Sequence, residues 1–156
     1  MKKIFISLGS NVGSRQKILE EALFSFQQHD FISIEKVSSF YESTAWGKIE
    51  QDSFLNAVLE ATTLLSPHEL LESCQTIERD LGRSKKSDFG PRCIDLDILF
   101  YGEEVVCEET LLIPHPLLHE RHFVLKGLKE ISPEFQHPIL SLSVSELYEK
   151  INLNGI

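Results

Sequence analysis

Strand-like and helix-like hydrophobic periods follow one another along this chain in an order that few folds accommodate. The expected elements are a strand ending at Gly9, a helix from Ser14, an alternating β-branched segment from Phe31, a strand from Ser53, a helix over 66–82 and a strand over 94–102. This β-α-β-β-α-β order, with short helical stretches added at the C-terminal side, predicts an α+β fold. The expected arrangement is a ferredoxin-like sandwich in which two helices cover one face of an antiparallel sheet and leave the other face free for a ligand.

The helix within the segment 66–82 has the clearest boundaries. Ser66 can act as the N-cap, Pro67 suits the first helical position, and Glu69 completes a capping box. Gly82 is expected just beyond the end of the helix. The 156 residues contain no repeat, low-complexity tract or glycine-serine linker, so we expect a single domain over 1–156.

The acidic balance of the chain limits its partners. Fifteen Lys and Arg residues stand against 24 Asp and Glu residues, giving a formal net charge of -9. Such a chain has no overall field that attracts nucleic acid or an anionic membrane. The N-terminal residues contain no apolar core of a signal peptide, and no long apolar span follows. We therefore expect a cytoplasmic protein, monomeric by default, that binds neither nucleic acid nor membrane.

The cysteines offer no metal or disulfide pattern. Cys74, Cys93 and Cys107 are odd in number, widely spaced, and include no CxxC pair. A zinc site or a disulfide framework is therefore not expected. All three are interpreted as small buried hydrophobic residues.

Two aspartates interrupt the apolar run in GPRCIDLDILFYG at 90–102. Because side chains alternate along a strand, Ile94, Leu96 and Ile98 point one way, while Asp95 and Asp97 point the other. Carboxylates about 6.6 Å apart repel by about 2.5 kcal/mol at an effective dielectric of about 20, which a divalent cation would relieve. Mg²⁺ suits such hard oxygen ligands and takes its remaining ligands from water and phosphate. The alternative is an edge strand whose solvated face carries two acids.

Basic residues flank this strand in the sequence. The segment 79–92 holds five basic residues against two acidic ones, and the basic residues are Arg79, Arg83, Lys85, Lys86 and Arg92. It has the composition of a loop that closes over phosphates, although a solvated helix end would also explain its lysines. GSNVGS at 9–14 is not a P-loop, because it lacks the Lys-Ser/Thr pair. Phosphate would thus be neutralised by Mg²⁺ and by arginines from other segments, with His115 and Arg121 as further candidates.

Taken together, these motifs resemble the 6-hydroxymethyl-7,8-dihydropterin pyrophosphokinases (HPPK) of folate biosynthesis. The resemblance covers almost the whole chain. It is carried by GSN at 9–11, SSFYES at 38–43, FLN at 54–56, Gln75 and Glu78 with the following Gly82-Arg83, GPRCIDLDIL at 90–99, PHP at 114–116, and Arg121 with Phe123.

The resemblance implies transfer of the β,γ-pyrophosphoryl group of ATP to the hydroxymethyl oxygen of the reduced pterin, with release of AMP. It implies two Mg²⁺ ions, with Asp95 and Asp97 as their ligands. The implied catalytic residues are Arg83, Arg92, Asp95 and Asp97. Nucleotide binding is implied for Leu71, Gln75, Glu78, Lys85, Arg92, Ile98, Leu112, His115 and Arg121. Pterin binding is implied for Ser43, Thr44, Trp46, Phe54, Asn56, Asp95 and Phe123.

The implied pterin site agrees with elementary chemistry. A flat heterocycle stacks well between aromatic rings, here Phe54 and Phe123. The amide of Asn56 offers both a donor and an acceptor to the pyrimidinone edge. Two other classes stay open on the residues alone: a metal-dependent phosphohydrolase or nuclease that uses the two aspartates to activate water, and a non-catalytic ferredoxin-like module that binds a nucleotide or RNA.

Overall fold

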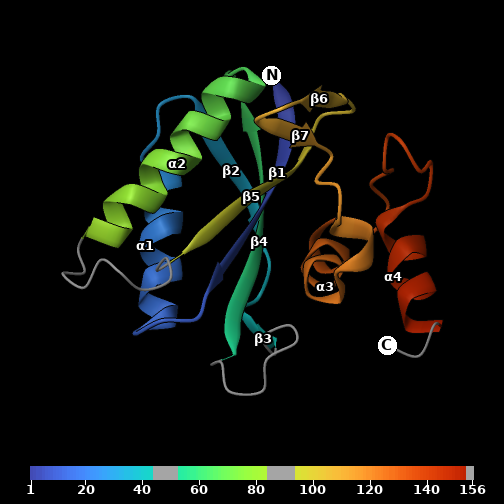
Figure 1. Cartoon of the computed structure of the whole chain (residues 1–156), viewed down its shortest axis with the longest axis horizontal. Helices are drawn as coiled ribbons and strands as arrows, with labels where there is room; N and C mark the ends of the chain where they lie inside the picture. Colours follow the sequence, from blue (N-terminus) through green and yellow to red (C-terminus); the bar gives the residue numbers. More distant parts are fainter. Residues whose placement is uncertain (44–52, 84–93, 154–156) are drawn as a thin grey trace.

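The computed structural model of the chain describes residues 1–43, 53–83 and 94–153. Its centre is a five-stranded antiparallel sheet with the order β2-β4-β1-β5, in which β3 also pairs with β4 (Figure 1). The strands are β1 (Lys2–Ser10), β2 (Ile32–Val37), β3 (Tyr41–Ser43), β4 (Phe54–Thr63) and β5 (Asp95–Tyr101). The single alternating segment expected from Phe31 thus forms two strands, which pair with different halves of β4.

Helices and a small hairpin complete the described part of the chain. They are α1 (Arg15–Gln27), α2 (Pro67–Arg83), β6 (Val106–Glu108), β7 (Leu111–Ile113), the 3-10 turn η1 (Leu118–Glu120), α3 (His122–Ile131) and α4 (Val144–Leu153). The capping box is confirmed, because the Ser66 N–H donates to Glu69 Oε1 (2.8 Å) and the Glu69 N–H donates to Ser66 Oγ (3.2 Å). Gly82 lies inside the last turn of α2 rather than beyond it. The β6-β7 hairpin was not expected.

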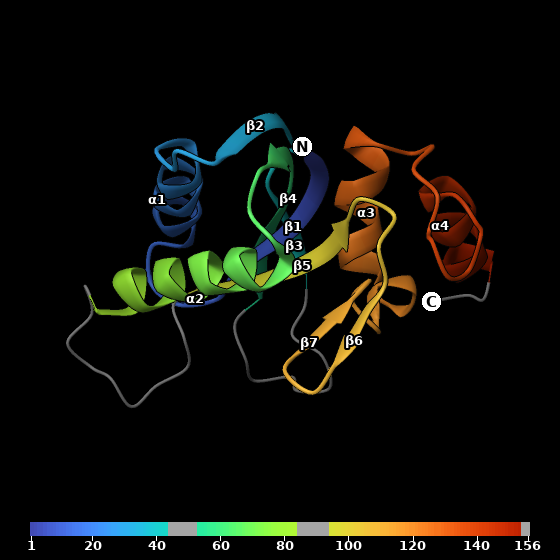
Figure 2. The ribbon, with the colours of Figure 1, turned by 90° about the horizontal axis from the view of Figure 1, so that it is seen from above.

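Helices cover both faces of the sheet. Figure 2 shows α1 and α2 on one side and α3 and α4 on the other. The first core contains Ile4, Ile6 and Leu8 of β1 with residues of α1 and α2. The second contains Phe5 with residues of α3 and α4. The α+β fold is confirmed, whereas the expectation of a free second face holds only for one end of that face, because the C-terminal helices bury the rest.

The second face changes from apolar to polar along its strands. Phe5 of β1 and Val58 of β4 are fully buried in the core that includes α3. Two residues along each strand, on the same side of the sheet, stand Ser7 and Asn56, which line a cavity instead. The uncovered end of this face is therefore the place at which the sheet offers polar groups to a ligand.

The cysteines follow the expectation only in part. Cys74 is buried on α2, as expected. Cys107 is exposed on β6, because it points outward from a two-stranded hairpin, so its interpretation as a buried residue is wrong. Cys93 lies outside the described residues. In the described ranges, no helix has the length and the apolar character needed to cross a membrane.

Candidate active site

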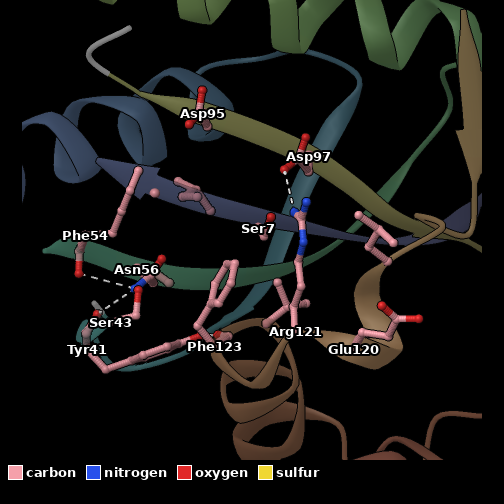
Figure 3. A pocket seen from close by; sticks show the side chains of 15 residues that line it. Ser7, Tyr41, Ser43, Phe54, Asn56, Asp95, Asp97, Glu120, Arg121 and Phe123 are labelled. Carbon is pink, nitrogen blue, oxygen red and sulfur yellow. Dashed lines mark hydrogen bonds and ion pairs between the residues drawn. The ribbon is translucent and has the colours of Figure 1, made fainter. Parts of the chain in front are cut away.

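A cavity of about 450 Å³ lies at the uncovered end of the second sheet face. Its walls come from β1, β3, β4, β5 and the segment from η1 to the start of α3 (Figure 3). It brings together these residues of the expected site: Ser43, Phe54, Asn56, Asp95, Asp97, Arg121 and Phe123. Segments that are far apart in the sequence thus form one pocket.

One wall of the cavity is formed by the two aspartates of β5. Both side chains line the cavity (Figure 3), whereas Leu96 between them is 7% exposed and belongs to the core beneath α2. The alternation expected from the sequence is therefore confirmed. Glu78 of α2 fixes this strand, because its Oε2 accepts the Leu96 N–H at 2.8 Å. From the facing wall Arg121 extends toward Asp97, with 4.0 Å between Nη1 and Oδ2.

His115 lies close to this charged wall and outside the lining of the cavity. Its Nδ1 accepts the Leu117 N–H at 3.2 Å, so a neutral ring carries its proton on Nε2. Burial lowers the pKa of His115, and the positive charge of Arg121 adds to that effect, while the negative charge of Asp97 opposes it. The imidazole is therefore a neutral hydrogen-bond donor at neutral pH.

The other wall of the cavity is aromatic and holds a fixed amide. Asn56 is 5% exposed, and its Nδ2 donates to Ser43 Oγ (2.9 Å), the Tyr41 carbonyl (3.2 Å) and the Phe54 carbonyl (3.3 Å). These bonds use the NH₂ group within the protein, so the amide offers its Oδ1 as an acceptor. A Cβ atom at Gly9 would lie 3.3 Å from this Oδ1 and 3.6 Å from the Phe54 ring, so glycine keeps the floor of the cavity open.

Phe123 is held in place from β3. The Tyr41 hydroxyl donates to the carbonyl of Phe123, and burial raises the pKa of Tyr41 far above its ordinary value, which keeps the hydroxyl protonated. Close packing of α3 permits this bond, because Gly127 stands where a Cβ atom would lie 2.5 Å from Val58 Cγ2. The Arg121 guanidinium lies over the Phe123 ring, 5.8 Å from its centre.

Several expected residues lie elsewhere. Leu71 packs against the core, Gln75 is exposed on α2, Ile98 is buried in β5 and Leu112 is 45% exposed on β7. None of these four, nor Glu78, lines the cavity. Thr44, Trp46, Lys85 and Arg92 lie outside the described residues, and Arg83 is the last residue of α2. Their roles stay predictions.

Other lining residues were missed by the sequence analysis. They are Ser7, Leu8, Gly9, Tyr41, Ala57, Leu117, Glu120 and Val124. Tyr41 stands within the SSFYES motif and Gly9 within GSN, so the motifs themselves carried a signal for these two. Ser7 could have been found by counting two residues back from Gly9 along the strand.

The cavity of this α+β sandwich combines a carboxylate wall, an arginine and a pair of phenylalanines, groups of the kind that bind cations, phosphates and planar rings in phosphate-transferring enzymes. The sequence model of one family, 7,8-dihydro-6-hydroxymethylpterin-pyrophosphokinase (HPPK), matches residues 5–133. The chain therefore belongs to the HPPK family, whose enzymes are pyrophosphokinases of folate biosynthesis.

Individual relatives agree with the family. The chain is 42% identical over 146 residues to the 2-amino-4-hydroxy-6-hydroxymethyldihydropteridine pyrophosphokinase of Aquifex aeolicus, covering 94% of this chain and 90% of that protein. It is 46% identical over 148 residues to the folic acid synthesis protein fol1 of Pneumocystis carinii, covering 95% of this chain but only 20% of that longer protein.

A solved structure that includes an HPPK domain has a similar fold. A crystal structure of Plasmodium falciparum HPPK-DHPS superposes with a TM-score of 0.77 at 16% identity, over 96% of this chain and 43% of that chain. This similarity establishes the ferredoxin-like fold of an HPPK domain.

Proposed function

We propose that this chain transfers the β,γ-pyrophosphoryl group of ATP to the hydroxymethyl oxygen of 6-hydroxymethyl-7,8-dihydropterin and releases AMP. The single observation that carries the proposal is that one cavity combines two chemistries. Phe54, Asn56 and Phe123 suit a flat heterocycle, and Asp97 with Arg121 suits phosphates and their cations. Membership of the HPPK family supports the same reaction.

The pterin would stack between Phe54 and Phe123. Stacking on aromatic rings suits a planar heterocycle, and Asn56 Oδ1 would accept a hydrogen bond from an N–H group of the pyrimidinone edge. Ser43 supports the Asn56 amide from β3. Thr44 and Trp46, expected from the sequence to contribute backbone groups here, complete the proposed pterin site.

Asp95 and Asp97 would hold two Mg²⁺ ions. The described residues contain no group of three or more His, Cys, Asp and Glu side chains that could enclose a metal ion. Two carboxylates nevertheless fit Mg²⁺, which commonly takes one or two of them and fills its other positions with water and substrate phosphates. When bound, Mg²⁺ would lower the pKa of the attacking hydroxyl group and neutralise charge on the phosphates.

Most of the rate would come from positioning and charge neutralisation, because this transfer needs little covalent help from a protein. Arg121 would bind phosphate oxygens with its guanidinium fork, and the neutral His115 would donate a hydrogen bond from Nε2. Arg83, Lys85 and Arg92 are proposed to add positive charge around ATP.

The adenosine part of ATP would bind beside α2 and β5. The residues proposed for it are Leu71, Gln75, Glu78, Ile98 and Leu112. Because the Ile98 side chain is buried, it could contribute only backbone groups. Glu78, whose carboxylate accepts the Leu96 N–H, would act by holding β5 in register beside the nucleotide.

A product analysis tests the proposed reaction. The protein is incubated with ATP, Mg²⁺ and the pterin, and the adenine product is identified. AMP formed only when the pterin is present supports the proposal. AMP or ADP formed without the pterin would instead indicate the phosphohydrolase class, and binding without any turnover would indicate a non-catalytic module.

The proposal also covers the domain organisation, the oligomeric state and the location of the protein. We propose one catalytic domain over 1–156, because both cores share one sheet, and a monomer acting on small molecules. A cytoplasmic location agrees with the use of ATP.

A further inference from the structure

Arg15 joins three segments of the chain at the edge of the cavity. It is the first residue of α1, and its Nη1 donates to the Ser53 carbonyl at 2.9 Å and to Ser53 Oγ at 3.3 Å. The same guanidinium bonds to both carboxylate oxygens of Glu42, with 3.4 Å to Oε1 and 3.2 Å to Oε2. Ser53 Oγ in turn donates to Glu42 Oε1 at 2.8 Å. We call Arg15, Glu42 and Ser53 the hairpin clamp.

The position of Arg15 is unfavourable without this clamp. A positive charge in the first turn of a helix is repelled by the helix dipole. Ser14 makes no side-chain capping bond, and the first turn of α1 contains no acidic residue. Glu42 of β3 supplies a negative charge beside this turn. The Arg15 side chain is largely buried, with 27% of it exposed. The bonds from Arg15 and then from Ser53 hold the pKa of Glu42 below its ordinary value.

The clamp lies next to the residues of the proposed pterin wall. Glu42 immediately precedes Ser43, and Ser53 immediately precedes Phe54. Ser43 and Phe54 face each other as partners at the open end of the β3-β4 ladder, and both line the cavity. Because a three-residue strand at the edge of a sheet has little support of its own, bonds from outside the ladder help to fix the distance between them.

A shift of β3 would also disturb Asn56. Its Nδ2 bonds to Ser43 Oγ, the Tyr41 carbonyl and the Phe54 carbonyl, so the orientation of the amide depends on the register of β3 against β4. Arg15 is thus linked through Ser53 and Glu42 to the segments that carry two cavity-lining residues, Phe54 and Asn56, without lining the cavity itself.

We propose that Arg15 is a positioning residue for the pterin: through Glu42 and Ser53 it fixes the β3-β4 hairpin so that Phe54 and Asn56 are preorganised for the heterocycle. This inference rests on the proposed function. The aspartates of β5 and Arg121 lie outside the clamp, so ATP binding and the chemical step at saturating pterin do not depend on it.

Variants of Arg15 distinguish an effect on pterin binding from an effect on ATP binding or on kcat. Arg15→Ala should raise the dissociation constant and the KM for 6-hydroxymethyl-7,8-dihydropterin about tenfold, equivalent to about 1.4 kcal/mol. The KM for ATP and kcat at saturating pterin should change by less than about twofold, the pattern of lost ground-state binding. Arg15→Lys should recover part of the pterin affinity, because an ammonium group keeps the charge but not the fork. A double-mutant cycle with Glu42→Gln should show that the two losses are not additive.

The matched control is Lys2→Ala. Lys2 forms an exposed ion pair of 3.0 Å with Glu104, far from the cavity lining, and its loss should leave pterin binding unchanged.

The inference is overturned if Arg15→Ala binds the pterin normally, or if ATP binding, kcat and melting temperature fall together with pterin affinity, which would indicate a purely structural role. The wild-type protein is assayed first: if it makes no AMP with the pterin or does not bind it, the proposed function fails and this inference fails with it. Normal wild-type turnover with an unaltered Arg15→Ala variant overturns the inference alone.

Discussion

Arg121 and Asp97 face each other across the cavity, with 4.0 Å between Nη1 and Oδ2. This distance exceeds that of a direct hydrogen bond, and both side chains are partly exposed, at 30% and 42%. An ion pair of this kind contributes little to stability. The two side chains can therefore separate at small cost to the fold. The carboxylate is then able to bind a cation, and the guanidinium is able to bind a phosphate.

Replacing either aspartate of β5 should remove the reaction without unfolding the protein. Asp95→Asn and Asp97→Asn are expected to lower kcat by about a thousandfold or more, corresponding to about 4 kcal/mol of transition-state stabilisation. AMP formation measures the loss, and thermal melting measures the fold. Glu103→Gln removes an equal charge from the exposed turn after β5 and should keep full activity. Near-normal turnover in either aspartate variant would contradict the metal role.

The aromatic pair should determine affinity for the pterin. Phe54→Ala and Phe123→Ala are each expected to weaken pterin binding about tenfold, because stacking of a heterocycle on an aromatic ring is worth about 1–3 kcal/mol. Titration with the pterin in the absence of ATP measures this effect. Phe31→Ala, at a side chain that is 51% exposed and outside the cavity lining, is the control. Equal affinities in all three variants would exclude stacking.

Gly127 should be intolerant of a side chain. A Cβ atom there would meet Val58 Cγ2 at 2.5 Å and Tyr41 Oη at 2.6 Å, so Gly127→Ala is expected to lower the free energy of unfolding by about 1–3 kcal/mol through overpacking. Denaturant titration measures the change. Gly82→Ala provides the contrast, because nothing lies within 4 Å of the added atom and alanine favours a helix by about 1 kcal/mol. An unaltered stability of Gly127→Ala would show that α3 can move away from the sheet freely.

His137 should make the stability depend on pH. Its Nδ1 accepts the N–H groups of Ile139 and Leu140, both at 3.1 Å, and burial, followed by the charge of His119, lowers its pKa from 6.5. Between the unfolded and folded pKa values the unfolded chain holds the extra proton. The free energy of unfolding therefore falls as the pH drops below 6.5, by at most about 1.4 kcal/mol per pH unit.

The variant that tests this dependence is His137→Asn, whose side-chain oxygen can still accept a backbone bond but does not titrate. Denaturant titrations at several pH values should show a smaller loss of stability on acidification in this variant than in the wild type. The exposed His68→Asn variant should lose stability on acidification at least as steeply as the wild type. A wild-type and a His137→Asn curve of equal slope would refute the assignment.

Local features of this fold could be predicted because the residues that decide them are close in sequence. Ser66 and Glu69 stand three residues apart, and the reciprocal bonds between them are present. Asp95 and Asp97 alternate with buried residues, and that period alone predicts which face of the sheet they share. The family resemblance added Phe54, Asn56 and Phe123, the proposed pterin-binding residues, and these line one cavity with the aspartates.

Long-range contacts could not be predicted in the same way. Nothing near Arg15 in the sequence indicates Glu42 or Ser53 as its partners, and nothing near Tyr41 indicates the carbonyl of Phe123. The burial of the second sheet face also depends on where α3 and α4 pack, which their own hydrophobic periods do not specify. Cys107 was misjudged for a similar reason, since a short hairpin exposes residues that a longer strand would bury.

The fixed amide of Asn56 sets a rule for inhibitor design. Its NH₂ group lies within hydrogen-bond distance of the Tyr41 carbonyl, the Phe54 carbonyl and Ser43 Oγ, so rotating the amide would set its oxygen against the two carbonyls. The pocket therefore presents the Asn56 oxygen. At the proposed pterin site, a compound with a ring N–H at this point is matched, whereas an N-methylated analogue meets a steric clash and an aza-substituted analogue sets two lone pairs against each other. Medicinal chemistry on this scaffold should vary the opposite edge of the ring and leave that hydrogen in place.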